Sequence, residues 1–147
     1  MVDLKRAYCV KIMIRTKSIH TRRQGLHEIT SEVEDVVAEA GIREGLCTVF
    51  LQHTSASLTV QENADPSARK DLEAWLNRLV KEHDPLYTHT LEGADDMPSH
   101  IKAVITCTSL SIPILNGALA LGTWQGVYLW EHRKSPQQRS FVIHVRV

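Results

Sequence analysis

The sequence predicts an α+β fold: one compact, sandwich-like domain of mostly antiparallel β-sheet with two longer helices, spanning residues 1–147. Most segments alternate apolar and polar side chains, as half-buried strands do, and two stretches show the three- to four-residue spacing of an amphipathic helix. No internal repeat, low-complexity tract or linker interrupts the 147 residues, a length that suits a single core.

The composition is that of an ordinary globular protein, with 43% hydrophobic and 23% charged residues. Lys and Arg together number 17, as do Asp and Glu, so neither nucleic acid nor an anionic membrane is expected as a partner. No apolar run is long enough to span a bilayer and the N-terminal residues lack a signal-peptide pattern, so we expect a cytoplasmic protein. The widely spaced Cys9, Cys47 and Cys107 predict buried free thiols.

The first part of the chain predicts a strand, a polar connection and a helix. Residues 8–15 alternate as in a half-buried strand, and the basic residues 16–25 predict a loop or the start of a second strand. A helix is expected from residue 29, with Ser31 and Glu34 as a capping box and Gly41 at its end. Its apolar face consists of Ile29, Val33, Val36, Val37 and Ala40.

The middle of the chain predicts two strands and the second long helix. Residues 45–54 carry apolar side chains on both sides, which indicates a central strand, and residues 57–61 form a second, shorter one. Asp65 is a favourable N-cap and Pro66 a favourable first helical residue. The helix after them is expected to bury Ala68, Leu72, Trp75, Leu76 and Leu79.

The last third predicts a short helix and three further strands. The helix is expected to begin near Pro98 and to run to residue 106, and a strand follows over residues 109–114. Asn116 and Gly117 predict a two-residue type I′ turn, which returns the chain into a long strand over residues 123–133. After a turn at 134–139, a closing strand over 140–147 points Phe141, Ile143, Val145 and Val147 inward.

Eight histidines in this length draw attention to metal or acid–base chemistry, and His53, His89 and His100 are the candidate metal ligands. His53 follows the end of the predicted strand 45–54, next to hydroxyl side chains. His89 and His100 flank a polar run that contains three carboxylates. For each histidine the alternative is a side chain that only makes hydrogen bonds at the end of a strand or loop.

Carboxylates and basic groups surround the same candidates. Glu92, Asp95 and Asp96 are candidates to bind a divalent ion, to orient the histidines or to act as a base, and the alternative is a solvated loop in which Asp95 or Asp96 caps the next helix. Asp95 is preferred over Glu92, and capping is the preferred explanation of Asp96. Glu131 needs a partner if its side of the strand is buried, and otherwise occupies an exposed edge. Lys102 and Arg133 are the predicted partners for phosphate or carboxylate, and Ser55 is a candidate hydroxyl donor to a bound anion.

Three blocks resemble the YjbQ-like family, whose members are often described as secondary thiamine-phosphate synthases: H-T-S-A-S-L-T-V-Q-E-N-A-D-P, H-T-L-E-G-A-D-D-M-P-S-H-I-K and the segment S-L-S-I-P-I-L to W-E-H-R. The resemblance implies a compact α+β fold with antiparallel sheets, a homotrimer and a pocket formed by these blocks. The polar residues to which it maps that pocket are His53, Ser55, Asn63, Asp65, His89, Asp95, His100, Gln125 and Glu131.

Three functional hypotheses follow. The first is a metal-dependent transferase that resembles secondary thiamine-phosphate synthase, with His53, His89 and His100 holding zinc or magnesium. Asp95, Glu131 and Ser55 are its expected catalytic residues, and Lys102, Arg133, Asn63 and Gln125 are expected to bind the small phosphorylated substrate. The second is a metal-dependent hydrolase of a small metabolite, and the third a non-catalytic trimer that binds a small anion.

Overall fold

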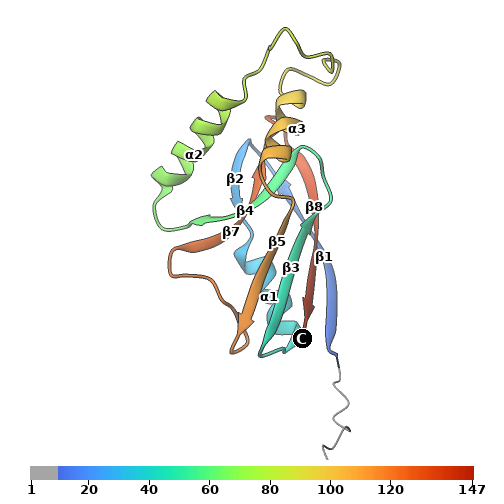
Figure 1. Ribbon diagram of the computed structural model, residues 1–147, viewed down its shortest axis with the longest axis vertical. Coiled ribbons are helices and arrows are strands. Elements are labelled where there is room, and N and C mark those ends of the chain that lie inside the picture. The colour runs from blue at the N-terminus through green and yellow to red at the C-terminus, as the bar shows by residue number, and fades with distance from the viewer. Residues whose placement is uncertain (1–9) are drawn as a thin grey trace, which may run out of the picture.

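Two antiparallel sheets and three helices make up residues 10–147, the part of the chain that this computed structural model describes (Figure 1). The larger sheet contains, in spatial order, β1 (Ile12–Thr21), β8 (Gln137–Arg146), β3 (Gly45–Leu51), β5 (Ser109–Leu115) and β6 (Ala118–Leu119). The smaller sheet contains β2 (Gly25–Glu28), β7 (Gln125–Glu131) and β4 (Ala56–Glu62). The predicted α+β class is confirmed.

The main core lies between the larger sheet, the smaller sheet and helix α1 (Thr30–Ala40). Val33, Val36 and Val37 face this core as their spacing predicts, and Gly41 ends the helix in the left-handed conformation at φ 58°. The predicted capping box is wrong, because the residue before the helix is Ile29 and no side chain caps the first turn. Thr30 instead accepts a hydrogen bond from the backbone N–H of Val127, which ties the start of the helix to β7.

Helix α2 (Pro66–Leu79) covers the outer face of the smaller sheet, where Leu76 packs with Leu26, Tyr128 and Trp130. The Asp65 side chain accepts a hydrogen bond from Ser67 N, as expected of an N-cap. The expectation that Trp75 and Leu79 are buried is wrong, because α2 packs through a narrow stripe and leaves them 52% and 56% exposed.

Helix α3 (Asp96–Ile105) lies across one end of the fold, where β3 ends and β4 and β5 begin (Figure 1). The 89–95 segment enters this helix, so the polar stretch of the sequence is delivered to that end of the sheets. The helix begins two residues before the predicted Pro98.

The strands differ from the prediction mainly at their ends. The basic segment after residue 15 continues β1 to Thr21, because β8 pairs with β1 along ten residues. The predicted central strand is shorter and ends at Leu51, and the closing strand begins at Gln137 inside the expected turn. The Asn116-Gly117 turn is confirmed, with φ of 53° and 85° between the paired Leu115 and Ala118.

Two predictions of burial fail at the surface. Val147 lies beyond the last strand and is 65% exposed. Cys107 is an exposed free thiol, whereas Cys47 is buried, which raises the pKa of its thiol to about 11. Cys9 lies outside the described residues. Among residues 10–147, no helix has the length and apolar character needed to cross a membrane.

Candidate functional site

His89, Asp96 and His100 come together where the 89–95 segment meets helix α3, and one ligand atom of each lies within 4.8 Å of the others. Nε2 of His89 is 2.7 Å from Oδ2 of Asp96, and Nε2 of His100 is 3.2 Å from the same oxygen. Asp96 and His100 are one helical turn apart, which places both on one face of α3. Asp96 is 2% exposed, whereas both histidines reach the surface.

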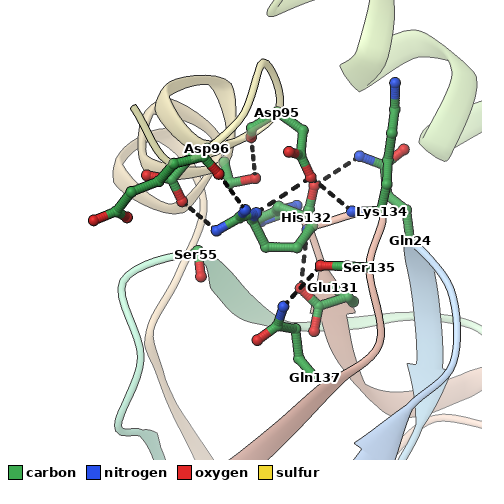
Figure 2. A network of polar contacts seen from close by, with 12 residues as sticks. Gln24, Ser55, Asp95, Asp96, Glu131, His132, Lys134, Ser135 and Gln137 are labelled. Atoms are coloured by element: carbon green, nitrogen blue, oxygen red, sulfur yellow. Dashed lines mark hydrogen bonds and ion pairs between the residues drawn. The ribbon is translucent and has the colours of Figure 1, made fainter. Parts of the chain in front are cut away.

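Arg133 fixes the carboxylates of this group: its guanidinium pairs with Oδ1 of Asp96 and lies 3.2 Å from Oδ2 of Asp95. It also donates to the carbonyl of Glu92 at 2.9 Å. Figure 2 shows Asp95 and Asp96 close together above His132, with the main chain of Lys134 donating to Asp95. Arg133 therefore fixes the loop and the carboxylates, and each of its three guanidinium nitrogens donates to a group of the protein.

The charge state of Asp96 results from opposing effects. Burial by itself raises the pKa of Asp96, but the hydrogen bond from His89 and the charges of Arg133 and His100 together lower it. The pKa of Asp95 is lowered in the same way, because Lys134 N and Arg133 outweigh its burial. Both groups are carboxylates at neutral pH, as a cation site requires.

A second carboxylate, Glu131, lies fully buried at the end of β7 and is saturated by hydrogen bonds. Arg139 binds both of its oxygens, at 2.6 and 2.7 Å, Thr21 donates at 2.8 Å and Arg133 N at 2.9 Å. Arg139 also donates to the hydroxyl of Ser55 at 3.0 Å. This geometry gives Glu131 and Ser55 a structural role, and their predicted part in catalysis stays a prediction.

The structure places His53 beside the site rather than within the His89–Asp96–His100 group. Nε2 of His53 accepts a hydrogen bond from Ser140 N at 2.7 Å. Burial, followed by the charge of Arg139, lowers the pKa of His53, so its ring is neutral at pH 7 with the proton on Nδ1. His53, Thr54 and His100 border one surface hollow of about 550 Å³.

Asn63 and Gln125 lie together at the opposite end of β4 from Thr54. The side chain of Asn63 donates to the carbonyl of Gln125 at 3.4 Å, and Gln125 itself accepts from Gly122 N at 2.7 Å. Seven residues of strand, roughly 20 Å, separate them from the histidines, so one chain does not bring the two groups together. Asp65 lies at that same distant end as the cap of α2.

Lys102 lies on the side of α3 opposite His100, because two residues turn a helix by about 200°. It is 4% exposed, and its Nζ donates to Oδ1 of Asn77 on α2 at 2.5 Å. Burial lowers the pKa of this ammonium. The neighbouring His132, 1% exposed, contacts the Ser57 hydroxyl through Nε2 at 2.9 Å, and burial lowers the pKa of His132 to about 3.

Sequence reasoning ranked one residue of these networks too low and gave two others no functional role. Asp96 was one of three candidate carboxylates, but capping was preferred for it; the N-cap is Asp95, and Asp96 turns inward between two histidines. The i, i+4 spacing of Asp96 and His100 within one predicted helix was the available signal. Arg139 was assigned to a turn, although Glu131, the carboxylate it binds, lies only eight residues before it. His132 had no assigned role, because its partner Ser57 lies 75 residues away.

The geometry thus defines an antiparallel α+β protein with a His–Asp–His group at one end of its sheets. A model of the family described as UPF0047 protein YjbQ-like matches residues 15–146, and the chain belongs to this family.

Relatives from bacteria align along most of the chain. The UPF0047 protein sll1880 of Synechocystis is 53% identical over 127 residues, 86% of each chain. The UPF0047 protein YjbQ of Escherichia coli O157:H7 is 44% identical over 81% of this chain and 86% of its own. Among solved structures, a YjbQ/UPF0047-family protein of Clostridium acetobutylicum has a TM-score of 0.81 and 35% identity, covering 88% of this chain and 97% of its own. The hypothetical protein TT1486 of Thermus thermophilus has a TM-score of 0.79 with the same identity and coverage.

Proposed function

We propose that this protein is a divalent-metal-dependent enzyme that acts on small phosphorylated metabolites. The observation that supports this proposal is the convergence of His89, Asp96 and His100. Two imidazoles and one carboxylate suit zinc better than magnesium, which prefers oxygen ligands. This donor set differs from the three histidines expected from the sequence, since Asp96 takes the place of His53.

The residues around the group support metal binding by orienting its donors. Nδ1 of His100 is 3.0 Å from the carbonyl of Thr54, which fixes the ring with Nε2 directed toward Asp96, so Nε2 is the nitrogen that would bind a metal. Arg133 occupies one oxygen of Asp96 and leaves the other directed at both histidines. When bound, zinc would polarise a phosphoryl oxygen of the substrate.

The proposed substrate position is the hollow that His53 and His100 share. A phosphate there would lie beside the histidine donors, and the proton on Nδ1 of His53 is available for a hydrogen bond to it. Asp95 remains the proposed supporting carboxylate, because it holds Arg133 and the start of α3 in place.

The reaction proposed first is the one that the family resemblance implies. The carbon of hydroxymethylpyrimidine diphosphate loses pyrophosphate, and the ring nitrogen of thiazole phosphate forms the new carbon–nitrogen bond. Hydrolysis of a small phosphorylated metabolite is the second candidate, since two histidines and a carboxylate also form catalytic zinc sites in hydrolases. A non-catalytic anion-binding protein is the third.

The experiment measures bound metal in the purified protein and product formation from both thiamine precursors, with a panel of phosphate esters in parallel. We expect bound zinc and turnover that chelator abolishes, and we expect His100→Ala to lose both. His20→Ala, which removes an exposed histidine on β1, is the matched control. Product formation as fast in His100→Ala as in the wild type would contradict the proposal. Tight substrate binding without turnover would support the third candidate.

We also propose a cytoplasmic homotrimer. The face of the larger sheet opposite α1 supports assembly, because Ile12, Ile14 and Phe50 lie on it at least half exposed. In such an assembly, Asn63 and Gln125 of one subunit can approach the histidines of another. Light scattering tests this proposal against the 16.6 kDa monomer, and a monomer at micromolar concentration would contradict it.

A further inference from the structure

Lys102 is a buried cation without a counter-ion among residues 10–147. It is 4% exposed, and its one side-chain acceptor is the neutral amide oxygen of Asn77. The carboxylates nearby have other partners: Glu82 pairs with Lys134 at 2.6 Å, and Asp95 binds Arg133 and Lys134 N. Glu73, which lines a cavity together with Lys102, accepts from Leu26 N at 2.7 Å and pairs with Arg23 at 3.6 Å. Lysine is almost never this buried unless its charge is paired, because desolvating an unpaired ammonium costs several kcal/mol.

Lys102 lines both a small cavity and an open groove. The cavity, about 30 Å³, is also lined by His132 and has room for one water molecule. The groove, about 250 Å³, is bordered by Lys81, Lys102 and Lys134 together with Asn77 and Gln24. The two hollows share Lys102, so an acceptor placed in the groove can reach its buried ammonium.

The charge of the groove is strongly positive. Among residues 10–147, three lysines and one carboxylate, Glu82, border the groove, which leaves two positive charges. Helix α2 ends beside the groove, and its C-terminal carbonyls contribute only about half a negative charge. The remaining charge suits a dianion better than a single carboxylate.

We propose that this groove is a phosphate-binding site in which a phosphate group, free or carried by a small metabolite, supplies the missing counter-charge of Lys102. Lys102 binds the phosphate at the base of the groove, and Lys81 and Lys134 bind it at the mouth. The site is distinct from the His89–Asp96–His100 group: it lies across α3 from it, and it requires neither a metal nor the proposed reaction.

The test is a calorimetric titration of the full chain with inorganic phosphate, in chelator and at constant ionic strength set with chloride. We expect saturable binding by the wild type, weakened about tenfold or more in Lys102→Met, since a hydrogen bond to a charged group is lost. Lys70→Met, an exposed substitution on α2 away from the groove, is the matched control and should bind as the wild type does.

A double variant, Lys81→Met with Lys134→Met, keeps the test valid if Lys102→Met fails to fold, and we expect a loss of similar size. Competition by glycerol phosphate would assign the site to phosphate monoesters, whereas binding of inorganic phosphate alone would assign it to the free ion. Absence of saturable binding by the wild type would overturn the proposal. Equal affinity in the wild type and in both lysine variants would overturn it as well.

Discussion

Two buried carboxylates, Glu131 and Asp96, lie near each other and differ in their hydrogen-bond partners. Glu131 is closed: Arg139, Thr21 and the backbone N–H of Arg133 provide four hydrogen bonds. Asp96 is open: Arg133 binds one oxygen, and the other faces His89 and His100, which both reach the surface. Figure 2 shows the two carboxylates at opposite sides of His132.

The difference separates a structural from a functional use of a buried charge. A carboxylate with four protein donors has no remaining site for a ligand, and loss of one partner leaves the other charge unpaired. A carboxylate directed at two surface histidines can exchange those hydrogen bonds for a cation. A substitution of Glu131 should therefore mainly lower the stability of the fold, whereas a substitution of Asp96 should mainly lower the affinity for a cation.

The largest expected effect is on the free energy of unfolding of Glu131→Gln. Arg139 would remain buried without its counter-ion, so we expect a loss of about 3 kcal/mol, measured by urea unfolding. Glu39→Gln is the control, because it breaks the exposed pair with Arg15 and should change stability little. Equal losses in the two variants would mean that the buried Glu131–Arg139 pair contributes no more to stability than an exposed pair does.

Asp96→Asn should instead affect metal affinity first. We expect its zinc affinity to fall by about 100-fold, because a charged ligand is lost, while its free energy of unfolding falls less than that of Glu131→Gln. Arg133 keeps Asp95 and the Glu92 carbonyl as partners, which limits the structural damage. Glu34→Gln, at an exposed carboxylate of α1 away from the site, is the control in the competition titration. Unchanged affinity in Asp96→Asn would exclude Asp96 as a ligand.

The next effect is a pH dependence of stability that comes from His132. Burial holds the pKa of this histidine at about 3, below the value of about 6.5 in an unfolded chain. Below pH 6.5 the unfolded state therefore binds a proton that the folded state does not, and stability falls as the pH falls.

Between pH 6.5 and 5 this difference amounts to about 2 kcal/mol, and His132→Gln should lack that part of the slope. Urea unfolding at both pH values measures it. Parallel pH dependence in the wild type and the variant would contradict the assignment.

The smallest expected effect concerns the unpaired cation of the phosphate groove. In phosphate-free chloride buffer, Lys102→Met should raise the free energy of unfolding by about 1 kcal/mol, because an apolar side chain replaces a buried charge. Thermal and urea unfolding measure the change, with Lys70→Met as control. Destabilisation of several kcal/mol would mean that Lys102 is paired as Glu131 is.

Much of the fold was predictable because its signals are local. The positive φ angles of Asn116 and Gly117 and the Asp65 cap depend on a few neighbouring residues. The exposure of Trp75 was not predictable, because helical spacing identifies an apolar face but not how wide a stripe of it the smaller sheet covers.

The site was predictable only in part. Residues 89–102 were identified from their density of titratable side chains, and His89 and His100 do converge there. Asp96 was ranked below Asp95 because an acidic residue at a helix start is usually a cap. Lys102 and Arg133, grouped as partners for phosphate or carboxylate, separate in the structure: Arg133 binds carboxylates, and Lys102 faces the far side of α3.

By itself the sequence determined the strands, the helices and the segment that carries the histidines, because backbone preference and hydrophobic periodicity act over a few residues. The tertiary structure alone decided which charges are paired. Glu131 meets Arg139 because β7 and β8, which belong to different sheets, approach each other at one end, whereas Lys102 meets only an amide. Glu131 and Arg139 are only eight residues apart, but their pairing requires the chain to pass from one sheet to the other after β7, and strand periodicity does not contain that change of sheet.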